Sequence, residues 1–311
     1  MFSIGVLPFA RRVVLLALLL LGAYLFGFLG STYEVWPGPR LGEAVRLLKF
    51  HLPFGSHNQD QFGRLRRYAG KVEVPCPPQD AETAAFVVAG QSNSANHGGQ
   101  RFQSVSGQVL NYYEGRCFLA SSPFLGAEGM LGESWTLLGH RLVQGNVYRR
   151  VIFIPGGVGS TPLVRWAQGG DLNRMLEGVI RDAKAHYTIS GVLWHQGETD
   201  YRLRTSKDAY EAQLRSLISS IRDLGVSAPI YISTASFEER YTDWAPANPI
   251  VEAQRAVVDG SAVFAGPNTD VIGAADRYDG THFSASGQEK FADQWFEILS
   301  RKKSDMRTQQ R

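Results

Sequence analysis

Residues 84–93 read AAFVVAGQSN, and this stretch decides the fold. Its first seven residues form a continuous apolar run of strand length, the pattern of a strand that is buried on both faces. Four more runs of this kind follow along the chain: RVIFIPG (150–156), GVLWHQG (191–197), IYISTAS (230–236) and AVFAGP (262–267). The sequence therefore predicts five strands of one sheet that is buried on both faces.

Amphipathic patterns with helical spacing lie between these runs. They predict helices over Gly129–Val143, Asn173–His186, Ser206–Leu224 and Ser284–Leu299. Strands that alternate with helices favour a parallel sheet covered on both faces, and such sheets bind their ligands beyond the carboxyl ends of the strands.

The composition excludes several classes of protein. The chain has 311 residues, of which 44% are hydrophobic and 20% charged, which is typical of a globular protein. Its formal net charge of +3 comes from the two ends, so the body between them is slightly acidic and no nucleic-acid partner is expected. Two cysteines are too few for an iron–sulfur cluster or a cysteine-rich zinc site.

The N-terminus predicts the compartment. Residues 13–33 carry no charge and are almost entirely apolar, and Arg11 and Arg12 precede them. This length fits a membrane-spanning helix, so we predict an uncleaved signal anchor over residues 1–30 that contacts the membrane through residues 13–30. A cleaved signal peptide is the alternative, and both place the body outside the cytoplasm, in the periplasm or at the cell surface. There Cys76 and Cys117 are either a disulfide or two buried thiols.

Behind the anchor, the chain is predicted to form one domain. Residues 31–80 are mixed in composition and end in the PCPP stretch of Pro75–Pro78, which is typical of a tether. The regular pattern of strands and helices predicts an α/β domain over residues 81–300. Residues 301–311 form a basic tail.

Three polar motifs stand at or near the ends of the predicted elements. Gly90-Gln91-Ser92-Asn93 follows the first strand, where a serine presents its hydroxyl at the rim of the sheet. Trp194–Asp200 (WHQGETD) ends the third strand, and Asp279–Ser284 (DGTHFS) precedes the last helix. An aspartate three residues before a histidine can turn back onto the imidazole and fix its tautomer. Each motif alone also fits a plain helix cap or turn.

A glycine turn lies between the first two motifs. Gly156–Pro162 reads GGVGSTP and is followed by Trp166. It completes neither a dinucleotide-binding pattern nor a phosphate-binding loop, since it lacks the required lysine. We interpret it as a turn whose backbone N–H groups can hold an anion.

These four blocks, in this order, resemble those of the SGNH (GDSL-like) hydrolase superfamily, in its sialate O-acetylesterase-like carbohydrate esterase branch. The resemblance covers about residues 84–300 and implies a flavodoxin-like, three-layer α/β/α sandwich with a five-stranded parallel sheet. It implies Ser92 as nucleophile, His282 as general base, Asp279 as its orienting carboxylate, and Glu198 as a residue that can share that role. For the oxyanion hole it implies the N–H groups of Ser92 and Gly159 and the side-chain amide of Gln196. We also expect Gln91, Asn93, Trp166 and His195 to contact the substrate.

The chain departs from the branch at two places. Ser94–His97 stand where the branch commonly has Met-Ala-Gly after the serine motif, and the glycine turn reads Gly-Ser-Thr-Pro instead of Gly-Gly-Thr-Ser. Both changes border the expected substrate pocket.

The predicted function is a serine esterase that removes O-acetyl or other short acyl groups from a carbohydrate, without a metal or organic cofactor. Ser92 would attack the ester carbonyl and pass its proton to His282, and water would then release the acid. Two alternatives remain at this point. One is an acetyltransferase that acts on a cell-envelope polysaccharide with the same triad, and the other is a carbohydrate-binding protein with an inactive site.

Overall fold

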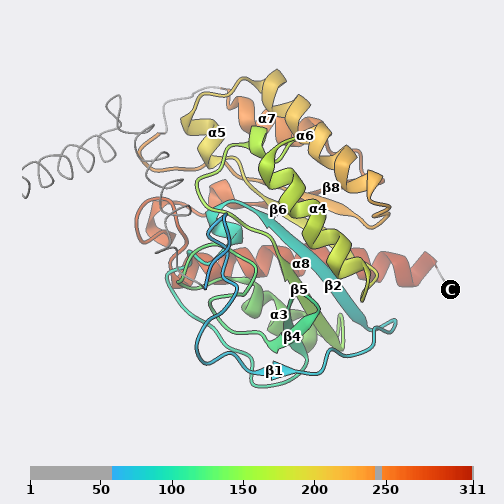
Figure 1. Ribbon diagram of the computed structural model, residues 1–311. Coiled ribbons are helices and arrows are strands. Elements are labelled where there is room, and N and C mark those ends of the chain that lie inside the picture. Colours follow the sequence, from blue (N-terminus) through green and yellow to red (C-terminus); the bar gives the residue numbers. More distant parts are fainter. Residues whose placement is uncertain (1–57, 242–246, 310–311) are drawn as a thin grey trace, which may run out of the picture. The chain divides into compact units, whose positions relative to one another are not determined.

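A computed structural model describes residues 58–241 and 247–309 (Figure 1). The predicted signal anchor, residues 1–30, and much of the predicted tether lie outside the described residues. Among the residues that are described, no helix combines the length and the apolar character that crossing a membrane requires.

The centre of the domain is one mixed, mostly parallel sheet. Its strand order is β1-β4-β3-β5-β2-β6-β7-β8, and all neighbouring pairs are parallel except β1 with β4 and β3 with β4. The strands are β1 Glu73–Val74, β2 Thr83–Gly90, β3 Val109–Tyr113, β4 Arg116–Leu119, β5 Arg150–Pro155, β6 Gly191–His195, β7 Ile230–Thr234 and β8 Val263–Asn268.

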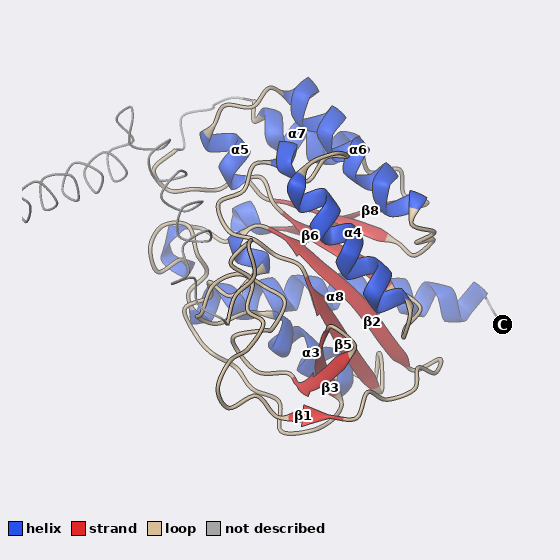
Figure 2. Cartoon of the chain, in the orientation of Figure 1, coloured by secondary structure: helices blue, strands red, loops and turns tan. Residues whose placement is uncertain are grey.

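Helices cover both faces of this sheet (Figure 2). Helices α4, α6 and α7 lie on one face, and α3 and α8 lie on the other. The α-helices are α3 Trp135–Gln144, α4 Asp171–Lys184, α5 Glu198–Arg202, α6 Lys207–Asp223, α7 Pro249–Ala256 and α8 Ala285–Gln309, and the 3₁₀ helices are η1 Ser92–Ser94, η2 Leu163–Arg165, η3 Thr269–Val271 and η4 Ala274–Asp276.

The side chains of strand β2 pack into two hydrophobic cores, one on each face of the sheet, which explains its unbroken apolar sequence. Ala85, Val87 and Ala89 pack in the core under α4 and α6, whereas Ala84, Phe86 and Val88 pack in the core under α3 and α8. Successive side chains of a strand point to opposite faces, so a strand between two cores cannot alternate with polar residues. Each large side chain fully buried in this way contributes about 1.5–3 kcal/mol to folding.

The five predicted strands are all present, as β2, β5, β6, β7 and β8, but the prediction of a five-stranded sheet was wrong. Strands β3, β4 and β1 extend it to eight. The sequence hid β3 because a buried polar residue, Asn111, interrupts its apolar run. The Asn111 amide bonds to the backbone N–H and C=O of Leu125, which lies in a loop, and no local pattern announces this partner.

Residues 58–80, which we assigned to the tether, belong to the same compact unit as the rest of the domain, which begins at Asn58. Residues 64–66 bond to neighbouring backbone, for example through the Leu65 N–H and the Ala127 carbonyl, 2.9 Å apart. At the other end, α8 continues through most of the predicted basic tail to Gln309. Helix α8 is therefore longer than its apolar pattern indicated.

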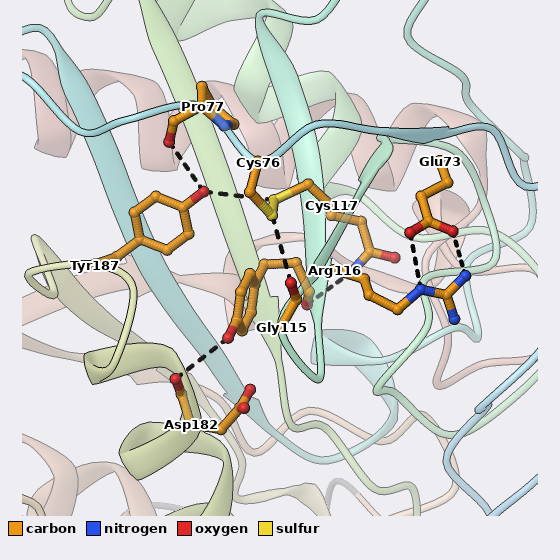
Figure 3. The surroundings of a disulfide bond; sticks show 10 residues. Glu73, Cys76, Pro77, Gly115, Arg116, Cys117, Asp182 and Tyr187 are labelled. Carbon is orange, nitrogen blue, oxygen red and sulfur yellow. Dashed lines mark hydrogen bonds and ion pairs between the residues drawn. A yellow bond between two sulfur atoms is a disulfide. The ribbon is translucent and has the colours of Figure 1, made fainter.

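A disulfide fastens the N-terminal segment to the edge of the sheet (Figure 3). It joins Cys76, just after β1, to Cys117 in β4, and thereby decides between the two states left open by the sequence. The Tyr187 hydroxyl contacts the Cys117 sulfur and donates to the Pro77 carbonyl, and Glu73 pairs with Arg116 beside it. The chain around the disulfide is thus held by side-chain contacts as well as by the covalent bond.

Reduction of this disulfide should destabilise the domain. The bond closes a loop with a sequence separation of 41 residues, and such a cross-link typically contributes about 2–4 kcal/mol to the free energy of unfolding. Urea unfolding with and without dithiothreitol measures the difference. The double variant Cys76→Ala/Cys117→Ala is the control, since its unfolding should not respond to the reductant. An unfolding curve of the wild-type protein that is unchanged by reduction would contradict the expectation.

Candidate active site

The polar motifs meet at the carboxyl edge of the sheet. Val88 of β2 pairs with Pro155 of β5, and Gly90 pairs with His195 of β6, so the segments after these three strands start side by side. Gly90 has φ of +128°, and a Cβ there would lie 1.9 Å from the His195 carbonyl oxygen. Only glycine fits this close approach, and it turns the chain into η1, whose first residue is Ser92.

His282 is held by a single carboxylate. Its Nδ1 lies 2.6 Å from Oδ2 of Asp279, while Oδ1 of Asp279 accepts the backbone N–H groups of Thr281 and His282. Partial burial opposes ionisation of Asp279, but the hydrogen bonds from His282 and Thr281, together with the attraction between the carboxylate and a protonated imidazole, outweigh it and lower the pKa of this carboxyl. The carboxylate fixes the Nδ1–H tautomer, which leaves Nε2 free to accept a proton.

Asn93 joins the serine turn to the histidine loop. Its Nδ2 donates to the Thr281 carbonyl at 3.2 Å, and its Oδ1 accepts the Phe283 N–H at 3.2 Å, so it bonds to the residues on both sides of His282. Nδ2 also donates to Glu198 at 3.0 Å. Because Asn93 follows Ser92 directly, these bonds hold His282 close to Ser92. We had expected Asn93 to contact substrate, whereas its amide is engaged within the protein.

Gln91 connects the serine turn by hydrogen bonds to the segment Trp194–Asp200. Its Oε1 accepts the backbone N–H groups of Gly197 and Thr199, at 3.4 and 3.2 Å. We had expected Gln91 to contact substrate, whereas its side-chain oxygen is engaged in holding these two loops together.

Gly159 lies beside Ser92, as its predicted place in the oxyanion hole requires. A Cβ at position 159 would stand 3.4 Å from the Ser92 Cβ. However, the Gly159 N–H already donates to Oε2 of Glu128, 3.0 Å away, and the same oxygen lies 2.6 Å from Nε2 of His97. The His97 ring stacks on the His282 ring, with centroids 5.2 Å apart.

The geometry does not fit the predicted role of Gln196 in the oxyanion hole. Gln196 is fully buried, and its Nε2 donates to the Thr161 carbonyl and to Asp200, while its Oε1 accepts from Tyr210. All of these partners are internal. The amide therefore braces the glycine turn against the third motif and has no donor left for a substrate oxygen.

His195 and Trp166 are likewise internal, in contrast to their predicted contact with substrate. His195 is fully buried, with Nε2 2.8 Å from the Thr269 hydroxyl, and burial together with the nearby Arg277 lowers the pKa of its imidazole to about 3. Trp166 is fully buried against Trp194, and its indole N–H donates to the Thr161 hydroxyl. Both side chains face the core because their strand and turn are covered by helices.

Glu198 is buried, and burial raises the pKa of its carboxyl. Asn93 Nδ2 donates to its Oε1, and Nδ1 of His195 lies 3.8 Å from the same oxygen. Asp279 is thus the carboxylate that touches the imidazole of His282.

Two residues of this site have no counterpart in our sequence predictions: His97 and Glu128. His97 lies in the segment 94–97 that departs from the usual pattern of the branch, which was a usable signal. Glu128 lies in an irregular loop without any local signal. Across residues 58–241 and 247–309, no three or more histidine, cysteine or acidic side chains are grouped in a way that could hold a metal ion.

A serine turn after a central parallel strand and a His–Asp pair thus lie at the same edge of the sheet, which is the arrangement that the resemblance to carbohydrate esterases implies. A family profile described as carbohydrate esterase, sialic acid-specific acetylesterase, matches residues 130–300. The match covers more than half of the chain, and the chain belongs to this family. The matched region contains Gly159, Asp279 and His282, and it begins after Ser92.

Solved structures share the fold. A protein from Arabidopsis thaliana is 16% identical, with a TM-score of 0.54 over 72% of this chain and 98% of its own. NanS is 12% identical, with a TM-score of 0.51 over 70% of this chain and 96% of its own. At such identities the likeness concerns the fold alone. Among curated protein sequences, none matches the chain.

Because Asp279 and Glu198 have different contacts, replacing each carboxylate by the corresponding amide should affect ester hydrolysis differently. Asp279→Asn should lower kcat by about 10⁴-fold, because it removes the group that fixes the His282 tautomer. Glu198→Gln, which keeps an oxygen for Asn93, should lower it far less. Initial rates with p-nitrophenyl acetate measure both variants. A nearly wild-type Asp279→Asn beside an inactive Glu198→Gln would reverse the assignment.

Proposed function

We propose that the protein is a serine esterase that removes O-acetyl or other short acyl groups from a carbohydrate. One observation carries the proposal: the His282–Asp279 pair is held beside the Ser92 turn by the two hydrogen bonds that Asn93 makes to Thr281 and Phe283. Membership of the carbohydrate esterase family supports the choice of an acylated sugar as substrate.

The reaction follows from these positions. Ser92 Oγ attacks the ester carbonyl while its proton passes to Nε2 of His282, and the carbonyl oxygen becomes an oxyanion. The N–H of Ser92, at the start of η1 and therefore without an acceptor within that helix, and the N–H of Gly159 are the donors for it. In a site shielded from water, each such donor contributes about 3–4 kcal/mol to transition-state stabilisation.

The imidazolium of His282 gives its proton to the departing sugar oxygen, which leaves the acyl-enzyme on Ser92. The neutral imidazole then takes a proton from water as it attacks the acyl carbon, and it returns this proton to Ser92 Oγ as the bond to the acyl group breaks and the acid is released. The charge that develops on His282 faces the ionised Asp279, which the Thr281 and His282 N–H groups keep deprotonated.

Replacement of the nucleophile tests this function. Ser92→Ala should reduce hydrolysis of p-nitrophenyl acetate to below a few per cent of the wild-type kcat, because it removes the attacking hydroxyl. Acetate release from a panel of O-acetylated sugars identifies the preferred substrate. Far-ultraviolet circular dichroism of the variant controls for folding. Substantial residual activity in a folded Ser92→Ala protein would refute the role of Ser92.

We also propose that the domain acts outside the cytoplasm on an N-terminal anchor. Two observations support this: residues 13–33 are free of charge and apolar, and a disulfide joins Cys76 to Cys117. Disulfides persist mainly in oxidising compartments.

A topology reporter tests the location. Alkaline phosphatase fused after Arg311 should be active, because this reporter folds only after export. A fusion to a chain that lacks residues 1–33 is the matched control and should be inactive. A silent full-length fusion, together with a C-terminus that resists added protease in spheroplasts, would contradict export.

A further inference from the structure

The carboxylate of Glu128 accepts the Gly159 N–H, which the reaction of Ser92 needs as a donor to the oxyanion. Glu128 Oε2 receives the Gly159 N–H at 3.0 Å and faces His97 Nε2 at 2.6 Å. Measured from the point where a Cβ of residue 159 would stand, this oxygen lies at 2.7 Å, His97 Nε2 at 3.1 Å and Ser92 Cβ at 3.4 Å. Glu128 Oε2 and Ser92 Cβ therefore lie next to the same residue, Gly159.

A carboxylate and an oxyanion cannot share this donor. Gly159 has one N–H, and two negative oxygens within hydrogen-bonding distance of it would repel each other strongly in a partly buried site. The arrangement seen here thus resembles the oxyanion-bound state, with a side chain of the protein in place of the reacting oxygen.

The backbone of Glu128 is fixed by hydrogen bonds, so a displacement of its carboxylate would involve the side chain alone. Its N–H donates to the Gly157 carbonyl and its carbonyl accepts the Asn96 N–H, both at 2.9 Å, and it forms an antiparallel bridge with Arg64. The side chain is 22% exposed. A change of rotamer toward solvent can therefore vacate the Gly159 N–H without any movement of the loop.

We propose that Glu128 is an autoinhibitory residue that competes with the substrate carbonyl oxygen for the Gly159 N–H, and that His97 holds it in the closed position. This inference rests on the proposed esterase function. Every productive encounter then includes displacement of the Glu128 carboxylate, so the wild-type enzyme works below the rate that its catalytic residues permit.

Glu128→Ala tests the competition. Removal of a charge-assisted hydrogen bond from the closed state should raise kcat/KM for p-nitrophenyl acetate about tenfold or more. The vacated Gly159 N–H should also donate to the product acetate, so the inhibition constant of sodium acetate should fall by about the same factor. Glu177→Ala is the matched control, because Glu177 pairs with Arg181 on α4 and should change neither quantity.

A second variant covers the case in which Glu128→Ala fails to fold. Glu128→Gln keeps the size of the side chain and a neutral acceptor, and it should shift both quantities in the same direction by a smaller factor. A folded variant with lower or unchanged kcat/KM and unchanged acetate inhibition would overturn the proposal. Loss of activity at constant melting temperature would instead make Glu128 a participant in the reaction.

Failure of the underlying function gives a different pattern. If the wild-type protein hydrolyses the ester and Ser92→Ala does not, a lack of gain in the Glu128 variants overturns only the competition. If the wild type is inactive and Glu128→Ala is active, the competition is supported. If neither hydrolyses the ester and neither reacts with a fluorophosphonate at Ser92, the proposed function falls, and the competition falls with it.

Discussion

The side-chain amide of Asn93 connects three loops that are far apart in the sequence, and the geometry of the site depends on it. Its partners Glu198 and Phe283 are 105 and 190 positions away along the chain. Since Asn93 is buried, these hydrogen bonds do not compete with water, and breaking one would leave a buried polar atom without a partner. The sheet brings the three loops to a common edge, and the hydrogen bonds of Asn93 fix the positions of these loops relative to one another.

The parts of the fold that could be predicted are those that a local pattern encodes. Strands β2, β5, β6 and β7 lie between two cores, so each reads as an unbroken apolar run, whereas β8 has a similar sequence at the edge of the sheet and is only partly buried. Strand β3 escaped prediction because Asn111 satisfies its amide through Leu125, and β1 escaped because two residues form no pattern. In both cases, the information lies in contacts between distant segments.

The same distinction holds at the site. Asp279 and His282 were predictable as a pair, because three residues of chain suffice for the carboxylate to turn back onto the ring and its neighbouring N–H groups. Gln196 was assigned to the wrong environment, because whether a polar side chain faces substrate or interior depends on its partners Thr161 and Asp200. Glu128 could not be found from sequence at all, since its significance comes only from its distance to Gly159.

Under a pulling force, the disulfide would separate the residues before Cys76 from the rest of the domain. A pulling force from the N-terminal side reaches residues 58–75 first, and these are attached to the domain non-covalently, by hydrogen bonds and by the packing of Leu65 with Tyr113 and Phe118. At Cys76 the force passes through a covalent bond into β4, which stops further peeling. The bridge between Arg64 and Glu128 lies on the weak side of this stop, and Ser92 lies on the strong side. Tension would therefore strip away the segment that backs Glu128 while the strand that carries the nucleophile stays in place.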